Sequence, residues 1–133
     1  MERAEMAVEF HKEKDYNCAQ SVLCAFEDAT GLERNTALAL TDGLGGGYKC
    51  GEICGALSGA VLAAGVILKN GGENPVRSGK IKSAVDGLTD RFKEEKGCLT
   101  CRELLKNGGR ARCNEYISDS VKMLEEILKG EQL

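Results

Sequence analysis

The chain contains no tryptophan, one proline and one histidine, and only three phenylalanines and three tyrosines among its 133 residues. Leu, Val, Ile, Ala and Met side chains must therefore supply most of the hydrophobic core. The single histidine, His11, lies in a charged stretch. We therefore expect no Ser/His/Asp catalytic arrangement, and a bound metal would find almost no imidazole ligands.

Basic charge is not in excess either. The 18 Lys and Arg residues are outnumbered by 21 Asp and Glu residues, the net charge is −3, and the two signs are interspersed along the chain. A surface that binds the phosphate backbone needs clustered Lys and Arg. We therefore expect that the protein binds no nucleic acid.

A long uninterrupted apolar run is also missing. The most apolar stretch, residues 53–68, would rise roughly 24 Å as a helix, whereas a bilayer core is roughly 30 Å thick. This stretch also contains three glycines and a serine. The charged N-terminal residues lead into no signal-peptide core. We expect a buried core helix, no membrane association and a cytoplasmic location.

Cysteine, by contrast, is abundant. A reducing compartment makes stable structural disulfides rare, and an odd number of cysteines cannot pair completely within one chain. The composition therefore favours metal binding or reversible thiol chemistry by some of the seven cysteines, which are Cys18, Cys24, Cys50, Cys54, Cys98, Cys101 and Cys113.

Apolar residues recur at helical spacing, and no segment alternates as a strand would. The pattern predicts an all-α fold: a single domain over residues 1–133, built as a bundle of about five to seven helices around a buried Gly/Ala-rich central helix. The expected helices span about 2–14, 18–31, 34–42, 49–69, 74–97, 101–105 and 110–129. In these ranges Gly31 and Gly97 end helices, and Asn74 and Pro75 begin one.

Most of the cysteines fall at expected helix starts. A helix N-terminus has unpaired N–H groups and a partial positive charge, and both stabilise a thiolate and lower the cysteine pKa. Such a sulfur is a better metal ligand or nucleophile. Cys24 differs because it lies in mid-helix beside Leu23, where a cysteine acts as a small core hydrophobe.

The local cysteine spacings leave the chemistry open. Cys98 and Cys101 form a CxxC pair, but the chain lacks the βαβ context of a thioredoxin-like motif and has no second CxxC for a zinc site. Cys50 and Cys54 have the i, i+4 spacing that places them on one helix face. Any metal would be held almost wholly by thiolates, as in zinc sites and iron–sulfur clusters.

Glycines form two further patterns. Residues 43–48 contain consecutive glycines that do not match a phosphate-binding motif, and they are expected to form either a plain turn or an anion-cradling nest of N–H groups. Gly51, Gly55 and Gly59 recur every fourth residue, which predicts close approach of another backbone. The approaching backbone belongs either to a neighbouring helix or to a second subunit in a homodimer.

Several of these residues together resemble a known family. The matching features are Cys18, the sequence Cys54-Gly55-Ala56-Leu57-Ser58-Gly59, the run Gly45-Gly46-Gly47, and Cys101 and Cys113. The chain resembles a family of redox-active proteins that is named for four cysteines and a CGAxxG motif and is frequent in anaerobes. The resemblance implies that Cys18, Cys54, Cys101 and Cys113 carry the chemistry. Cys50 and Cys98 lie outside the pattern and are expected at most as additional ligands.

Three functions remain open at this point. The first is an iron–sulfur protein for electron transfer or redox sensing, with the four matched cysteines as ligands and Gly45, Gly46, Gly47 and Gly55 around the cofactor. The second is a metal-free thiol–disulfide protein that pairs Cys54 with Cys18 or Cys98 with Cys101. The third is a module that binds zinc or another soft metal. The redox partner is unknown, and both an oxidoreductase and an electron-transfer component fit.

Overall fold

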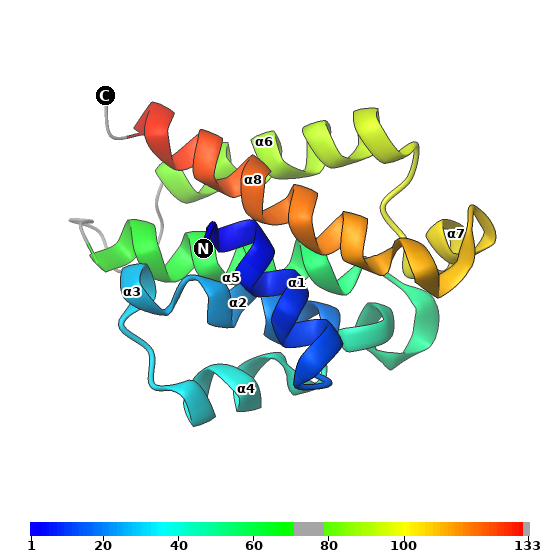
Figure 1. Ribbon diagram of the computed structural model, residues 1–133. Helices are drawn as coiled ribbons and strands as arrows, with labels where there is room; N and C mark the ends of the chain where they lie inside the picture. The colour runs from blue at the N-terminus through cyan, green and yellow to red at the C-terminus, as the bar shows by residue number, and fades with distance from the viewer. Residues whose placement is uncertain (71–78, 132–133) are drawn as a thin grey trace.

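The computed structural model describes residues 1–70 and 79–131 of the chain (Figure 1). Within these residues the protein has eight α-helices and no β-strand, which confirms the all-α prediction. The helices are α1 (Arg3–Glu13), α2 (Cys18–Ala25), α3 (Glu27–Thr30), α4 (Arg34–Asp42), α5 (Gly55–Asn70), α6 (Gly79–Lys96), α7 (Cys101–Lys106) and α8 (Cys113–Glu131).

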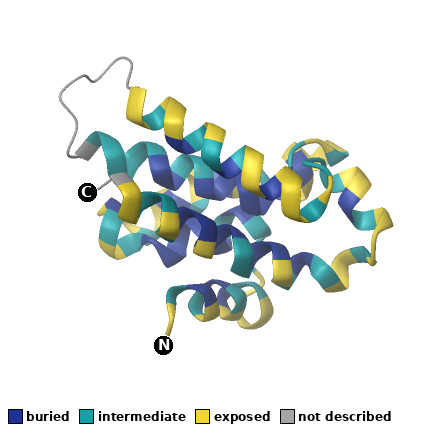
Figure 2. Ribbon diagram, turned by 90° about the horizontal axis from the view of Figure 1, so that it is seen from above, coloured by how far each residue is buried: buried dark blue, intermediate teal, exposed yellow. Residues whose placement is uncertain are grey.

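The helix α5 is the central element, as predicted from its Gly/Ala-rich composition. It packs against α2, α6 and α8, while α1 lies across α2 and α8 (Figure 1). Four alanines on α5 are fully buried and allow these neighbours to approach closely: Ala56, Ala60, Ala63 and Ala64. Figure 2 shows buried residues on the inward faces of the helices and exposed residues on the outward faces.

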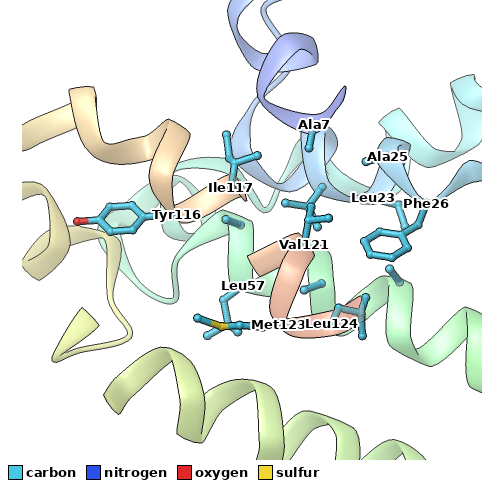
Figure 3. Close-up of a cluster of buried hydrophobic side chains, with 14 of the residues drawn as sticks. Ala7, Leu23, Ala25, Phe26, Leu57, Tyr116, Ile117, Val121, Met123 and Leu124 are labelled. Atoms are coloured by element: carbon cyan, nitrogen blue, oxygen red, sulfur yellow. The ribbon is translucent and has the colours of Figure 1, made fainter. Parts of the chain in front are cut away.

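Larger apolar side chains fill the space between these helices. Leu57 of α5 meets Ile117, Val121 and Leu124 of α8 in one cluster, and all four are almost completely buried (Figure 3). Each such side chain stabilises the fold by about 1.5–3 kcal/mol relative to exposure. The apolar stripe of the last helix faces the core at Ile117, Val121 and Leu124, and Leu128, one turn further on, is half-buried.

Close packing within the chain explains the glycine repeat. A Cβ atom on Gly59 would lie 2.7 Å from the carbonyl oxygen of Ala19 in α2, so only glycine lets α2 approach α5 this closely. Gly55 meets the same helix, whereas Gly51 lies outside α5. The repeat therefore marks a contact between helices of one chain, and it offers a second subunit no free glycine face.

The predicted start of the central helix is wrong. The helix begins at Gly55 rather than near residue 49, because the preceding backbone is left-handed: Gly46, Gly47, Tyr48 and Lys49 all have φ between 61° and 67°. These residues belong to a separate turn that ends at Gly51. Glycine adopts left-handed backbone without steric cost, so the consecutive glycines allow this turn to form before the helix begins.

The other helix boundaries agree with prediction to within a few residues, with two differences. The predicted helix over residues 18–31 is two helices, because the backbone at Phe26 leaves helical geometry, and Gly31 (φ 73°) then ends α3. This division raises the helix number above the predicted range. The last helix begins at Cys113, after a short 3₁₀ turn over Gly109–Arg112.

The fifth predicted helix is described from Gly79 onward, and Gly97 (φ 86°) follows its end as expected. Its predicted start at residues 74 and 75 lies outside the described residues. The apolar stripe of this helix is buried at Leu88 and Phe92, whereas Ile81 and Val85 are half-buried. Among the described helices, none combines the length and the apolar character needed to cross a bilayer.

Candidate functional site

Four cysteines lie at the N-termini of four different helices. Cys18, Cys101 and Cys113 are the first residues of α2, α7 and α8, and Cys54 immediately precedes α5. The carbonyl oxygen of Cys54 accepts the first helical hydrogen bond of α5, from the Ser58 N–H at 3.0 Å. The predicted placement at helix starts is therefore confirmed for these four residues.

Asn17 fixes the position of Cys18. Its side chain accepts a hydrogen bond from the Gln20 N–H at 2.8 Å, and the Gln20 side chain accepts one from the Asn17 N–H at 2.9 Å. This reciprocal capping box starts α2 at Cys18. The Asn17 amide also donates to the carbonyl oxygens of Thr41 and Asp42, which ties this helix start to the end of α4.

A short crossing of two extended segments positions Cys54 and Cys101. The Cys54 N–H donates to the Leu99 carbonyl oxygen at 2.8 Å, and the Cys101 N–H donates to the Glu52 carbonyl oxygen at 2.6 Å. Ile53 and Thr100 form an isolated antiparallel bridge between these bonds. Residues that are distant in sequence are thereby held side by side, and the starts of α5 and α7 become neighbours.

The four cysteines surround one small cavity of about 30 Å³. That volume has room for one or two water molecules. The lining contains no Asp, Glu or His side chain among the described residues, so sulfur dominates its chemistry. The lining residues are Cys18, Gly46, Cys54, Gly55, Cys101, Leu104, Leu105, Arg110, Cys113 and Tyr116.

Two of the sulfurs interact as a pair. The interaction of the Cys18 thiol with Cys113 stabilises the Cys113 thiolate and lowers its pKa from 9.0 to about 6. The positive charges of His11 and Arg110 act in the same direction. The same interaction, together with burial, raises the pKa of Cys18 far above its ordinary value. At neutral pH the pair therefore consists of a Cys113 thiolate and a Cys18 thiol.

The other two sulfurs remain thiols at neutral pH. Burial raises the pKa of Cys54 to about 11, although hydrogen bonds from the N–H groups of Leu57 and Ala56 oppose this effect. Burial also raises the pKa of Cys101, and the charge of Arg110 partly offsets it. The expectation that helix starts lower every cysteine pKa is therefore too simple, because desolvation outweighs the N–H groups at Cys54.

The remaining cysteines do not line the cavity. Cys50 is exposed, and its thiol donates to the Gly47 carbonyl oxygen at 3.5 Å. It shares no helix face with Cys54, because a turn with left-handed backbone separates them. Cys98 is half-buried against the edge of the core, ahead of α7 rather than within its first turn. Cys24 is 1 % exposed in the core, as predicted, and burial raises its pKa to about 11.

The glycines predicted to surround a cofactor have two roles. Gly46 and Gly55 line the cavity. A Cβ atom on Gly45 would lie 2.5 Å from the Asn17 side chain, and one on Gly47 would lie 2.9 Å from the Cys101 Cβ atom. Gly45 and Gly47 thus allow close packing against the segments that carry Cys18 and Cys101.

Sequence reasoning missed two charged residues near the cysteines. Arg110 lines the cavity, and no local motif distinguishes it from the other basic residues. His11 was expected in an exposed stretch, but it is half-buried, with Nδ1 2.7 Å from the Tyr16 carbonyl oxygen. Its inward position follows from its place one residue after Phe10, on the face of α1 that packs toward α8.

The four sulfurs are gathered, but they do not converge on one point. In the described residues, no three Cys, His, Asp or Glu side chains are placed so that they could hold a single metal ion. No disulfide joins any of the seven cysteines, all of which are described. The arrangement is therefore a group of four thiols around one cavity, in which Cys18 and Cys113 interact most strongly.

These features define a small helical protein with a cavity lined by four cysteines. The chain belongs to the family described as "Putative redox-active protein (C_GCAxxG_C_C)", which matches residues 16–127. This match confirms the resemblance seen in the sequence. The motif in the family's name begins with Gly-Cys-Ala, whereas this chain has Cys54-Gly55-Ala56, so the order of the first two residues is reversed. No curated protein and no solved structure matches the chain.

Proposed function

We propose that the protein is a thiol–disulfide redox protein in which Cys18 and Cys113 form the reversible couple. The observation that carries this proposal is that Cys18 and Cys113, at the starts of α2 and α8, border one small cavity, where their interaction favours a Cys113 thiolate beside a Cys18 thiol. A thiolate is the nucleophile in disulfide exchange, and a thiol that borders the same cavity is well placed to resolve the mixed disulfide. The pair differs from both pairings that the sequence suggested.

The reaction balances with a disulfide as the oxidant. The Cys113 thiolate attacks one sulfur of a disulfide RSSR, which forms a Cys113–S–SR bond and releases RS⁻. Cys18 then attacks the Cys113 sulfur, which forms the Cys18–Cys113 disulfide and releases a second RS⁻. The Cys18 proton ends on a released thiolate, so two protein thiols are oxidised while RSSR is reduced to two thiols.

The surroundings of the pair suit this role. Cys113 is only 9 % exposed, so it is shielded from indiscriminate oxidation, while Cys18 and Cys101 are more accessible. Cys101 and Cys54 border the same cavity and provide a second dithiol beside the first. If both pairs are oxidised to disulfides, the four cysteines around this cavity supply four electrons.

A redox titration tests the proposal. Protein is equilibrated anaerobically with mixtures of reduced and oxidised dithiothreitol, and its free thiols are counted after acid quenching. The thiol count should show a reversible two-electron transition. Cys18→Ser and Cys113→Ser should each abolish this transition, and Cys50→Ser, at an exposed cysteine outside the cavity, should leave it unchanged. A transition that survives Cys113→Ser would contradict the proposal.

An iron–sulfur protein is the second candidate, and one observation favours it. Sulfurs from four separate segments border one cavity whose described lining has no Asp, Glu or His side chain, and iron–sulfur clusters are held by four cysteine thiolates. Cys18, Cys54, Cys101 and Cys113 would be the ligands, and the cluster would supply one-electron transfer. Because cluster ligands bind different iron atoms, they need not converge on a single ion. The present placement gives a mononuclear zinc site no comparable support.

Elemental analysis separates the two candidates. If the protein binds a cluster, it should contain stoichiometric iron and sulfide, both when isolated without oxygen and after reconstitution with iron and sulfide. Its visible absorption should be lost in Cys54→Ser and retained in Cys50→Ser. The thiol–disulfide proposal predicts colourless protein that retains its two-electron dithiol transition. Stoichiometric iron in freshly isolated protein would therefore favour the cluster over the dithiol couple.

A further inference from the structure

Arg110 is the one charged residue in the lining of the cysteine cavity. It is exposed and also borders the cavity, so it lies where the cavity meets solvent. The 3₁₀ turn over Gly109–Arg112 places it three residues before Cys113. Gly108 and Gly109 both have positive φ, at 119° and 70°, and glycine is the residue that allows the tight turn between α7 and α8.

Within the part of the chain that the structure describes, no carboxylate forms an ion pair with Arg110, and its charge also stabilises the Cys113 thiolate inside the cavity. Its neighbours are paired: Arg112 lies 2.6 Å from Glu115, and Arg102 lies 3.6 Å from Glu52. Among the described residues, Arg110 forms no such ion pair. The segment over residues 101–113 also has four basic residues and one acidic residue, in a chain whose net charge is −3. The cavity mouth is therefore the place where an anion would meet an available guanidinium.

The size of the cavity limits how a substrate reaches the sulfurs. A cavity of about 30 Å³ has room for only one or two water-sized groups, which is less than a disulfide with its substituents needs. The reacting sulfur must therefore enter end-on, and the rest of the substrate stays outside. A carboxylate a few bonds from that sulfur would then lie beside the exposed guanidinium, which presents the planar donors that carboxylates bind.

We propose that the substrate of the dithiol site is a small disulfide that carries a carboxylate, and that Arg110 binds this carboxylate at the cavity mouth. The inference rests on the proposed thiol–disulfide function and specifies its substrate class. Arg110 acts as a binding and positioning residue, and the exchange remains the balanced reaction given above: RSSR is reduced to two thiols while Cys18 and Cys113 become a disulfide.

Two disulfide probes of different charge test this inference. One is 5,5′-dithiobis(2-nitrobenzoate), which carries two carboxylates, and the other is 4,4′-dithiodipyridine, which is neutral. The protein background is Cys50→Ser with Cys98→Ser, because these two cysteines lie outside the cavity and would react independently. The measured quantity is the ratio of the two second-order rate constants, with the Cys18–Cys113 disulfide verified by peptide mass spectrometry.

Arg110→Gln should lower this ratio about three- to tenfold, because attraction between opposite charges speeds only the anionic probe. Loss of Arg110 also makes the Cys113 thiolate less stable, but that change affects both probes and cancels in the ratio. Arg110→Lys should retain most of the ratio. Raising the salt concentration should lower it in the parent protein and barely change it in Arg110→Gln.

Arg91→Gln is the matched control, since Arg91 is an exposed arginine of α6 that pairs with Glu126 away from the cavity. It should leave the ratio unchanged. A ratio that is equal in the parent protein and in Arg110→Gln, with normal disulfide formation in both, would overturn this inference alone. Failure of both probes to produce the Cys18–Cys113 disulfide would overturn the proposed function and this inference with it.

Discussion

Cys18 and Cys113, the first residues of α2 and α8, border the same cavity, and their side chains interact there. They come from two helices at opposite ends of the chain, both of which pack against the central helix α5. The interaction favours the charged form of Cys113 and the neutral form of Cys18, so the pair divides into a thiolate and a thiol. This division accounts for a nucleophile and a resolving thiol in one site.

The pKa of Cys113 should depend on Cys18. Cys18→Ala removes the thiol that stabilises the thiolate, so the pKa of Cys113 should rise from about 6 toward its ordinary value of 9.0. Cys18→Ser retains an O–H donor and should produce a smaller rise. The pH dependence of Cys113 alkylation by iodoacetamide, followed by peptide mass spectrometry, measures both. An unchanged alkylation profile in Cys18→Ala would contradict this interaction.

The stability of the reduced protein should depend on pH in a defined direction. The pKa of Cys113 is lower in the folded protein than in the unfolded chain. Its contribution to the unfolding free energy is therefore fully present above about pH 9 and is lost as the pH falls through about 6. The pKa of Cys54 is higher in the folded protein, so its contribution to the unfolding free energy is present below about pH 9 and is lost as the pH rises through about 11. Urea unfolding in a reductant should show both trends.

Cys113→Ser provides the comparison for this pH series. The difference in unfolding free energy between the parent protein and this variant should grow from pH 6 to pH 9, since serine does not titrate there. His11 and Arg110 also stabilise the thiolate, so both remain unchanged in the comparison. A difference that is constant across this range would show that Cys113 is not a thiolate in the folded protein.

The contact between α2 and α5 should be intolerant of one added methyl group. Gly59→Ala places a Cβ atom 2.7 Å from the Ala19 carbonyl oxygen and should destabilise the protein by about 1–3 kcal/mol. Gly65→Ala is the matched control on the same helix, because its Cβ atom meets nothing within 4 Å. It should be neutral or stabilising by up to about 1 kcal/mol, since alanine favours helix. Thermal or urea unfolding measures the two changes.

Cys24 should behave as a core residue only. It is 1 % exposed and its pKa is raised to about 11, so it should resist alkylation in the folded protein and react only after unfolding. Cys24→Ala should cost about 1 kcal/mol of stability, as small buried deletions do, and leave the dithiol transition intact. Loss of that transition in a folded Cys24→Ala variant would place Cys24 in the functional site.

The cysteine placement could be predicted from the sequence because helix starts are local features. The helices predicted over 18–31 and 101–105 begin at the residues where α2 and α7 begin. Asn17 with Gln20, and Thr100 with Glu103, cap these two starts in the structure. The grouping of Cys54 with Cys50 failed for an equally local reason. Apolar periodicity gives no signal for a left-handed turn. The residues that form this turn were therefore assigned to the central helix.

The pairing within the site could not be predicted, because it depends on long-range packing. Cys18 and Cys113 interact only once α2 and α8 have both packed on α5. Arg110 likewise gains significance only from its position at the cavity. The family pattern identifies the four cysteines together, but it does not indicate which two interact most strongly.

The central claim is tested most directly by identifying the first disulfide that forms. Reduced protein is exposed anaerobically to one equivalent of a small disulfide, free thiols are alkylated after acid quenching, and cysteine-containing peptides are mapped by mass spectrometry. The account predicts that the Cys18–Cys113 disulfide forms first and that dithiothreitol reverses it completely. A first disulfide between other cysteines, or oxidation that leaves Cys18 and Cys113 as free thiols, would contradict it.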